Sequence, residues 1–523
     1  MLCVIATSFT GCFGRKKSGE AFSMPIMDEP TSLDPQIADS NSEKLVAANC
    51  YEGLVRIMAD GTIGKGVATD WNISDDGLTY TFKLRNNSHW AMFSGHKAVL
   101  GENYEDTFDI TVKAEDFKFG IERTLSEQTG SADAPLFSAV KSISTPDDFT
   151  IVFNLSYADD NFLYALTNPG AMPCDEEFFN LTNGKYGLDA KYLLCNGPFH
   201  VSKWTEKTSV KLAKNNEYNG ESSVSPSSVT FYINNDDSEV ADKMNSVTYD
   251  VAFLSSSQFS SIENKKDLNS VAVQNVTYSF IFNQNDNNYR NKNMRLAFCR
   301  SCDTSSLFDS QSDISKADGI VPPSCKIGGE DYRNGNAAEL LSYDETLAKK
   351  NFNDALLELG SSSVETTILC TEQYEPFVKQ MVQKLQKTLG VKFVSTVKVV
   401  SESDLEAAVN DGNYSVAFYP FKAKSSFAGE IIEVFDQNNI FGYESDVLSQ
   451  KIRNIKNNSG SLEGERSAVA DAENYLVSEA VIMPVFYENS YFVTSKKTSG
   501  IYFYSSADNV CFCLLYTSPS PRD

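Results

Sequence analysis

The sequence predicts an α/β protein that folds as two or more lobes. Its 523 residues exceed the content of one hydrophobic core, because single domains hold roughly 100–200 residues. Apolar residues make up 41% of the chain and charged residues 22%, which is typical of a globular protein rather than a disordered one. Residues 366–370, 376–389 and 391–400 follow the pattern of a strand, an amphipathic helix and a second strand. Such a βαβ unit favours a mainly parallel sheet covered by helices.

Hydrophobic periodicity predicts several further elements. Residues 21–36 begin as a short strand and continue as a loop punctuated by Pro and Asp, whereas residues 42–57 carry apolar side chains at helical spacing. An amphipathic helix begins near Ala114, and residues 145–156 are a turn followed by a strand. These elements mix both types of secondary structure along the chain.

A β-hairpin is predicted for residues 66–90, around an Asp-Asp-Gly turn at 75–77. Thr79, Thr81 and Lys83 alternate there with the apolar residues of 80–84. Because neighbouring strand residues point to opposite faces, one face is expected to be solvated and the other buried.

The formal net charge of −25 argues against a nucleic-acid partner. Binding to phosphates requires clustered Lys and Arg, and no basic stripe occurs in the sequence. We interpret the acidity as a solvated surface that keeps the protein soluble.

The N-terminal residues 1–20 are predicted to be a lipoprotein signal and tether. Residues 2–11 form a short apolar run that ends in small residues before Cys12, and a basic, polar stretch follows. This pattern is typical of bacterial lipoproteins, in which the cysteine is lipidated. The run is too short to span a membrane, which needs about 20 apolar residues. A basic segment normally precedes such a run, so we expect the natural start upstream of Met1.

Residues 513–523, CLLYTSPSPRD, are interpreted as foreign to the protein. They match one reading frame of a common transposon-end sequencing adapter, so we expect them to replace the natural C-terminus. They are not expected to take part in the fold.

The cysteines predict neither a metal site nor a cofactor. Cys3, Cys12 and Cys513 belong to the terminal segments, which leaves eight of the 11 cysteines. Cys299 and Cys302 form a CxxC, but no second CxxC exists and the chain has only three histidines. Their apolar surroundings at helical spacing favour structural or free thiols. A second pair, Cys174 and Cys195, is a candidate for a disulfide outside the cell.

Several motifs together resemble one family. They are DEPTSLDPQ, YEGLVR, WNISDDGLTYTFKLR, VKAEDFKFGIERTL, CNGPFHVSKW, YSFIFNQND and SYDETLAKKNFNDALLELG, in this order between about residues 21 and 500. Each motif alone is weak, but their order and spacing are similar to those of the extracytoplasmic oligopeptide- and dipeptide-binding proteins of ABC importers, solute-binding family 5.

The resemblance implies a two-lobed α/β fold of the periplasmic-binding-protein type (type II), with an extra subdomain and a hinge between the lobes. Lobe I would comprise residues 21–60, 190–274 and 486–512, and the subdomain residues 61–189. Lobe II would comprise residues 275–485. The family implies a monomer outside the cytoplasm, held on the outer face of the cytoplasmic membrane or in the periplasm, that delivers peptides or another small solute to permease subunits.

Family members close around an extended peptide and bind it chiefly through its main chain, as if a strand were added. The resemblance places the backbone-pairing segments around Asp28 and Glu29 in lobe I and around residues 419–421, including Tyr419 and Phe421, in lobe II. It also places three side chains near the cleft: Tyr278, Phe280 and Asn283. The alternative for the aromatic residues is ordinary core packing at strand spacing.

The sequence departs from the family where the ligand's amine is expected to bind. The strand in GNYSVAF leads to Lys422 and Lys424, and Lys424 stands where peptide-binding members carry an aspartate. A lysine would repel an ammonium group by several kcal/mol in a dry cleft. Three interpretations stay open: Asp28 or Glu29 receives the amine; the lysines bind an anionic or blocked ligand end; or an alignment gap leaves them solvated. An arginine that some members use for the peptide carboxylate likewise aligns with Val409.

Other function classes are less well supported. Ser-x-x-Lys occurs at residues 94–97 and 395–398, but no Lys-Thr-Gly accompanies it, so an enzyme is not predicted. A lipid-anchored ligand sensor is an alternative to an importer component. A non-peptide ligand, such as a nickel complex, haem or an oligosaccharide, is a second alternative. Sugar binding would require tryptophan platforms, and Trp71, Trp90 and Trp204 all lie in scaffold motifs.

Overall fold

A computed structural model describes residues 21–58, 62–159, 161–220, 224, 226–234, 236–302, 304, 314–423, 427–436, 439–458 and 461–496, and the backbone of 502–504 and 509–511. The side chains of residues 105, 106 and 237 are not described. Cys12, Lys424 and residues 513–523 lie outside this description. The chain forms two compact units: unit 1 is Met1–Ala272 with Tyr491–Asp523, and unit 2 is Val273–Ser490. This division does not test the predicted boundaries of lobe I, the subdomain and lobe II, which stay predictions.

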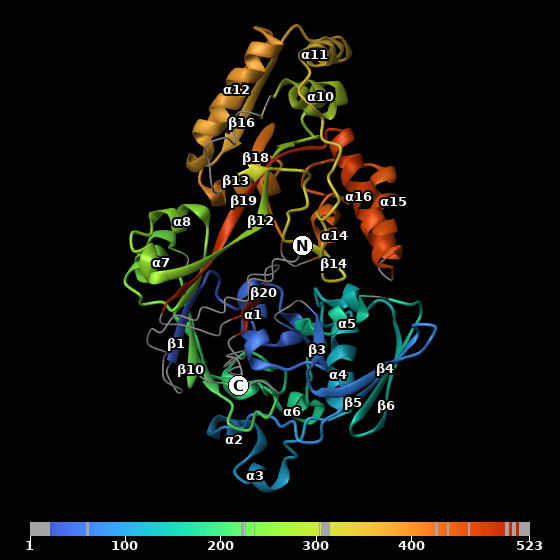
Figure 1. The fold of residues 1–523 in the computed structure, drawn as a ribbon, viewed down its shortest axis with the longest axis vertical. Helices are drawn as coiled ribbons and strands as arrows, with labels where there is room; N and C mark the ends of the chain where they lie inside the picture. The colour runs from blue at the N-terminus through green and yellow to red at the C-terminus, as the bar shows by residue number, and fades with distance from the viewer. Residues whose placement is uncertain are drawn as a thin grey trace, which may run out of the picture. The chain divides into compact units, whose positions relative to one another are not determined.

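Unit 1 contains two four-stranded sheets. The first has the order β1-β10-β9-β8, with β1 parallel to β10, its neighbour in Figure 1, and the other pairs antiparallel. The second is wholly antiparallel, with the order β4-β5-β7-β6, and lies within residues 61–189. The strands are β1 Ala21–Ile26, β4 Ala68–Ile73, β5 Thr79–Leu84, β6 Val140–Asp147, β7 Thr150–Leu155, β8 Phe199–Thr205, β9 Ser209–Lys214 and β10 Ser228–Ile233.

The helices of unit 1 and its short strands complete two hydrophobic cores. The larger core joins α1 and α4 to both sheets, and the smaller core joins α7 and α8 to β11. The helices are α1 Asn41–Cys50, α2 Lys97–Leu100, α3 Tyr104–Thr107, α4 Ala114–Leu125, α5 Phe162–Ala165, α6 Glu176–Leu181, α7 Asp237–Asn245 and α8 Ser256–Ser261. The short strands are β2 Val55–Ile57, β3 Ile63–Lys65, β11 Val251–Leu254, β20 Tyr502–Tyr504 and β21 Asn509–Cys511.

Unit 2 is built on a mixed sheet. Its strands follow the order β19-β12-β18-β16-β17, and β13 also pairs with β19. Strands β16, β17 and β18 are parallel, whereas β12 is antiparallel to β18. The strands are β12 Leu268–Phe282, β13 Ile314–Lys316, β14 Lys326–Ile327, β15 Glu330–Asp331, β16 Val364–Cys370, β17 Phe393–Val399, β18 Val416–Lys422 and β19 Ile482–Ser495. The chain passes between the units within β12 and β19.

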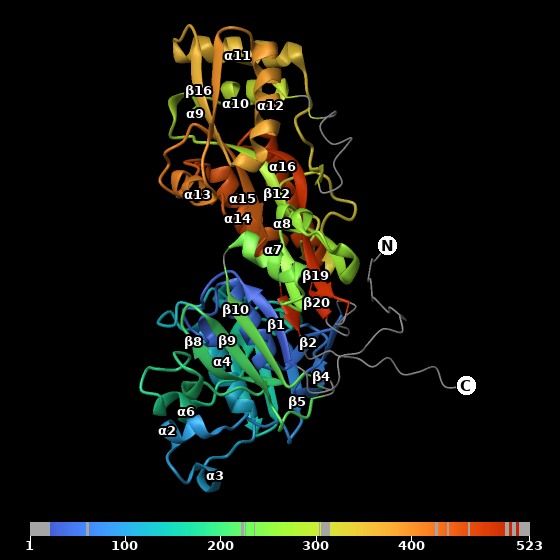
Figure 2. The same cartoon turned by 90° about the vertical axis from the view of Figure 1, so that its left-hand side faces the viewer.

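Helices cover both faces of this sheet. One core packs α10, α11 and α12 against the sheet, and the other packs α13 to α16 against the opposite face. Figure 2 shows α12 alongside β16, and Figure 1 shows α15 beside α16. The helices are α9 Asn287–Arg290, α10 Lys292–Ser301, α11 Glu345–Leu359, α12 Glu375–Leu389, α13 Glu402–Asn410, α14 Ala428–Glu433, α15 Asp446–Asn457 and α16 Leu462–Ser478.

Most local predictions are confirmed. The βαβ unit is β16, α12 and β17, and the predicted hairpin is β4 and β5, with Gly77 at φ 68° in the turn. In β5 the apolar residues are buried and Lys83 is exposed. The predicted helix over 42–57 is too long, because α1 ends at Cys50 and residues 55–57 form β2. The Gly53 and Leu54 carbonyls instead accept hydrogen bonds from residues 66–68.

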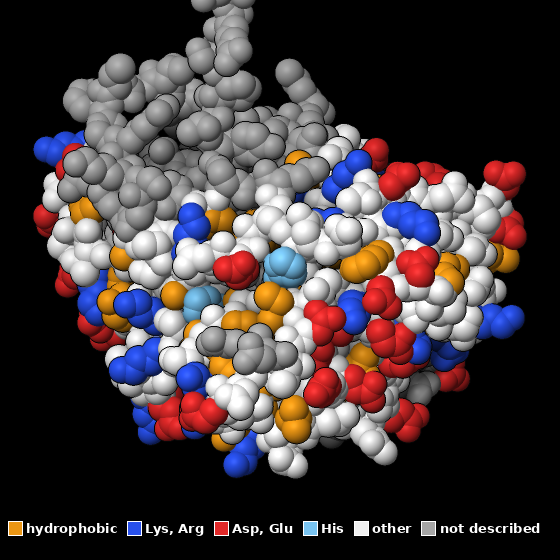
Figure 3. All heavy atoms as spheres, turned by 90° about the horizontal axis from the view of Figure 1, so that it is seen from below, with side chains coloured by type: hydrophobic (Ala, Val, Ile, Leu, Met, Phe, Trp, Pro, Cys, Tyr) orange, Lys and Arg blue, Asp and Glu red, His pale blue; other side chains and the backbone are white. Residues whose placement is uncertain are grey.

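The surface agrees with the composition. On the face drawn in Figure 3, acidic and basic side chains are interspersed among uncharged ones. No helix among the described residues is long and apolar enough to cross a membrane.

A buried imidazole makes unit 1 sensitive to acid. His96 is 1% exposed, and its Nε2 lies 3.1 Å from the Leu193 carbonyl. Its ring lies 4.3 Å from that of Phe93, whose other neighbour is His200 at 5.5 Å. Burial lowers the pKa of His96 to about 4, and burial also lowers the pKa of His200. The folded protein therefore binds fewer protons than the unfolded chain between pH 4 and 6.5, so the free energy of unfolding decreases as the pH is lowered through this window.

We predict that His96→Gln reduces the loss of stability between pH 7 and pH 5. The pKa of His96 implies that wild type loses about 2 kcal/mol from this group alone over that interval. Urea denaturation at both pH values measures the free energy of unfolding, with His89→Gln, which removes a half-exposed imidazole, as the matched control. If the free energy of unfolding depended on pH equally in wild type and His96→Gln, His96 would not be the source of the acid sensitivity.

Candidate functional site

The predicted ligand contacts of lobe II lie on two neighbouring strands of unit 2. Tyr278 and Phe280 belong to β12, and Tyr419, Phe421 and Lys422 belong to β18. The antiparallel register places Ser279 opposite Tyr419 and Phe280 opposite Phe418. The strand predicted within residues 412–418 is confirmed, and it extends to Lys422, an exposed side chain at its end.

The side chains of these residues divide between the two faces of the sheet. Tyr278 and Phe280 point toward α10 and α12, where Phe280 packs 4.9 Å from Phe418. Tyr419 and Phe421 point to the other face, where Phe421 stacks 5.7 Å from Phe435. Alternation along each strand requires this division, so the four aromatic side chains do not line one common pocket.

Three of the predicted contacts hold the fold together. Phe280 is 0% exposed and Phe421 6%, so both side chains belong to hydrophobic cores, as the alternative interpretation of the aromatic residues anticipated. Asn283 is buried, and its side-chain amide donates hydrogen bonds to the carbonyls of Gly412 (2.8 Å) and Tyr414 (2.7 Å). These bonds fix the segment that leads into β18. Ligand contact by these three residues stays a prediction.

No described strand pairs with the outer edge of β18 over residues 419–422. We call this segment the open edge. Strand β16 ends at Cys370 and pairs with β18 only at Val416 and Ala417. β18 continues for five residues beyond this pairing, and no other strand of the described residues joins its outer edge. The open edge therefore lies past the carboxyl end of a parallel strand, where α/β sheets commonly bind ligands.

Hydrogen bonds between β12 and β18 alternate along the two strands. This alternation defines which main-chain groups of β18 point away from β12. The Ala423 N–H donates to the Asn275 carbonyl (3.1 Å), and the Asn283 N–H donates to the Ser415 carbonyl (3.0 Å). Antiparallel pairs alternate in bonding, so residues 419 and 421 also bond to β12, and the main-chain groups of Pro420 and Lys422 point away from it. The presence of proline at position 420 is consistent with this outward direction, because proline has no N–H to offer a neighbouring strand.

A tyrosine and carboxylate network, which sequence reasoning missed, lies beside Tyr278. The Tyr374 hydroxyl donates to the buried Glu488 carboxylate, and the Gln373 amide donates to the same oxygen at 3.3 Å. The rings of Tyr278 and Tyr374 are 4.3 Å apart. Burial and the Glu488 charge raise the pKa of the Tyr278 phenol. The position of Tyr374, just after β16, is the signal that could have identified it.

Two exposed carboxylates of α13 act on the tyrosines near the open edge. Glu406 raises the pKa of the Tyr419 phenol, after the larger effect of burial. Glu402, the first residue of α13, contributes to the raised pKa of Tyr278. Negative charge is therefore present beside the open edge, although Lys422 ends the strand.

The two predicted contacts of lobe I belong to unit 1 and follow β1. Asp28 is exposed, and its N–H donates to the Ser42 hydroxyl at 3.3 Å. The Glu29 carboxylate accepts a hydrogen bond from the Lys207 N–H at 2.8 Å, in the turn between β8 and β9. Glu29 therefore stabilises this turn, and Asp28 presents its carboxylate to solvent. Binding by either residue stays a prediction.

The seven cysteines whose side chains the structure describes are free thiols. Cys299 and Cys302 are buried at the end of α10, which confirms the structural interpretation of the CxxC, and burial raises the pKa of Cys299 to about 12. The structure does not bring Cys174 and Cys195 together as the candidate disulfide requires: the Cys174 sulfur accepts a hydrogen bond from Arg123, and Cys195 contacts Cys50 instead. Among the described residues, no group of three His, Cys, Asp or Glu side chains could hold a metal ion.

The second Ser-x-x-Lys does not form a nucleophile and base pair. Ser395 and Lys398 both lie on β17, where residues three apart point to opposite faces. Ser395 is buried and Lys398 is exposed, so the ammonium group does not face the hydroxyl.

The family of this chain follows from its similarity to known protein families. Residues 62–440 match the model of the bacterial extracellular solute-binding proteins, family 5 Middle. The chain belongs to this family. Among its relatives, the family 5 protein described here is 24% identical over 497 residues to the dipeptide-binding protein DppE of Bacillus subtilis, covering 91% of this chain and 88% of that protein.

Solved structures share the fold of this family 5 protein. Listeria monocytogenes OppA bound to peptide has a TM-score of 0.72 at 20% identity and covers 96% of this chain and 100% of its own. NikZ from Campylobacter jejuni in complex with Ni(L-His) also has a TM-score of 0.72, at 16% identity, with 94% and 97% covered. The expected periplasmic-binding-protein fold is confirmed, and the fold is common to proteins with different ligands.

We predict that Tyr374→Phe destabilises this family 5 protein by about 2 kcal/mol, because it removes a hydrogen bond to a buried carboxylate. Urea denaturation measures the free energy of unfolding. Tyr157→Phe is the matched control, since its exposed hydroxyl contacts only another exposed hydroxyl, that of Ser138, among the bonds described. A loss no larger than that of the control would refute the structural role of the network.

Proposed function

We propose that this family 5 protein captures peptides outside the cytoplasm and delivers them to the permease of an ABC transporter. The open edge of β18 carries the proposal, because it offers outward-facing main-chain groups to an extended ligand. The relatives support it: DppE is named a dipeptide-binding protein, and the Listeria structure contains a peptide. Lipidation at Cys12 and a monomeric state complete the proposal.

The ligand would add to β18 as a further strand. Main-chain hydrogen bonds are common to all peptides, so they give affinity with little dependence on sequence. The half-buried rings of Tyr278 and Tyr419 lie on opposite faces of the sheet and would flank successive ligand side chains. Ligand capture would favour a closed arrangement only through higher affinity for it.

Binding of the charged ends of the ligand would depend on charged side chains of the protein rather than on main-chain pairing. Glu402 and Glu406 provide carboxylates near the open edge, so unit 2 has acids available for an ammonium group where the resemblance aligns Lys424 with the family's aspartate. Asp28 and Glu29 of unit 1 stay separate candidates for the same role. The second interpretation, an anionic or blocked end bound by Lys422 or Lys424, makes a different prediction for the Lys422 side chain. A single substitution site can therefore separate main-chain from side-chain recognition.

Native mass spectrometry of the full-length protein tests the proposed function. We expect a mixture of peptide masses that co-purifies with the protein and is released on denaturation. Their termini identify whether free amines are accepted. A single non-peptide mass, or an empty protein that peptide libraries leave unchanged, would refute peptide capture.

We predict that Lys422→Ala leaves peptide affinity within about 2-fold of wild type, because main-chain pairing does not use the lysine side chain. Titration calorimetry with a peptide found by mass spectrometry measures the affinity. Weak binding by Lys422→Ala would contradict main-chain recognition and favour a ligand end bound by the lysine.

A further inference from the structure

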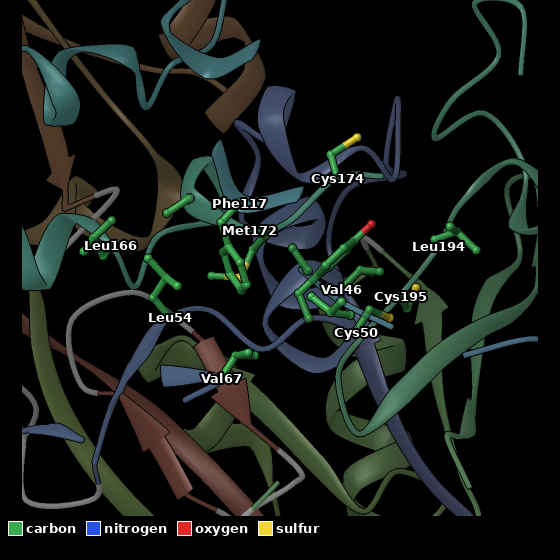
Figure 4. Close-up of a cluster of buried hydrophobic side chains, with 14 of the residues drawn as sticks. Val46, Cys50, Leu54, Val67, Phe117, Leu166, Met172, Cys174, Leu194 and Cys195 are labelled. Atoms are coloured by element: carbon green, nitrogen blue, oxygen red, sulfur yellow. The ribbon is translucent and has the colours of Figure 1, made fainter. Parts of the chain in front are cut away.

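Two buried thiols meet where the chain leaves and re-enters the first sheet of unit 1. Cys50 ends α1, and Cys195 lies four residues before β8. Their side chains are 0% and 1% exposed, and the two thiols are in hydrogen-bond contact. Figure 4 shows the two sulfur atoms close to each other, with Cys174 apart from them.

The main chains of the two segments are held together at the same place. The Gly197 N–H donates to the Cys50 carbonyl at 2.9 Å. The Asn196 side chain donates to the Glu52 carbonyl (2.9 Å) and accepts from the Glu52 N–H (3.0 Å). A Cβ atom on Gly197 would lie 2.6 Å from the Cys50 carbonyl carbon, so only glycine permits this approach. Cysteines can be joined without backbone movement only where their backbones already lie close, as here.

We propose that Cys50 and Cys195 form a disulfide bond when the protein folds outside the cytoplasm. The family is extracellular, and disulfides form and persist in that environment. The oxidant would be the disulfide of a thiol–disulfide oxidoreductase. One cysteine thiolate attacks that disulfide to give a mixed disulfide, and the second cysteine then displaces the oxidoreductase, which leaves as a dithiol. Two thiol hydrogens and two electrons pass to the oxidant.

The reaction belongs to folding rather than to the finished structure. Burial raises the pKa of Cys50 well above its usual value, so the folded thiol is a poor nucleophile. The pair would therefore react before the core closes around it. Cys174 is less suited as a partner, because its sulfur accepts a hydrogen bond from Arg123 at 3.5 Å.

The bond would close a large loop. Residues 51–194 lie between the two cysteines, and they include the whole subdomain predicted for residues 61–189. In the chain-entropy account, a crosslink restricts the unfolded chain more strongly as the loop becomes longer. The disulfide would therefore raise the thermal stability of unit 1, independently of which solute the protein binds.

Peptide mapping of the full-length protein under non-reducing conditions tests the bond directly. The protein is refolded in a mixture of reduced and oxidised glutathione, and free thiols are blocked before digestion. We expect one linked peptide pair that contains Cys50 and Cys195 and separates on reduction. Recovery of both cysteines as blocked free thiols would overturn the proposal, and so would a linked pair that contains Cys174.

Thermal unfolding provides a second, independent measurement. Wild-type protein refolded in dithiothreitol should unfold about 5–10 °C lower than oxidised protein. The double variant Cys50→Ala/Cys195→Ala should lose this difference, and Cys299→Ala, which removes a buried thiol of unit 2, should retain it. Identical midpoints for oxidised and reduced wild type would contradict a stabilising bond.

Discussion

The antiparallel pairing of β12 with β18 is the interaction on which unit 2 depends. Its register places Phe280 with Phe418 on one face and Ile281 with Ala417 on the other. Each face then packs its own group of helices, so one ladder organises two hydrophobic cores. The same ladder fixes which main-chain groups of β18 point outward. A slip of one residue would exchange the two faces and remove both cores, which makes the register strongly specified.

The open edge is a consequence of unequal strand lengths. β16 ends at Cys370 and the chain turns toward Tyr374, whereas β18 continues to Lys422. Beyond Ala417, β18 is therefore held by β12 on one side, and no described strand pairs with its other side. Exposed edges normally invite aggregation, and natural proteins protect them with proline and lysine. Pro420 and Lys422 fit that protective pattern, and the carbonyl of Pro420 still points away from β12.

Much of the fold could be predicted from local pattern. The alternation in 79–84, the turn at Gly77 and the βαβ unit are encoded within short windows, where propensity and periodicity agree. The roles of the site residues were harder to predict from the sequence, because the role of a residue such as Phe280 depends on which strand lies opposite it. The contact between Tyr374 and Glu488 joins residues more than 100 positions apart, and no local signal connects them. The pairing of Cys195 with Cys50 rather than Cys174 is long-range in the same sense.

Hydrogen–deuterium exchange over residues 418–422 tests the central claim, that peptide pairs with the open edge of β18. Exchange would be followed with and without a saturating peptide ligand. The account predicts slower exchange of this segment in the complex, because the ligand's main chain would pair with it, and little change in β17, which is separated from β18 by β16. Unchanged exchange over residues 418–422 in a saturated complex would contradict strand addition at this edge.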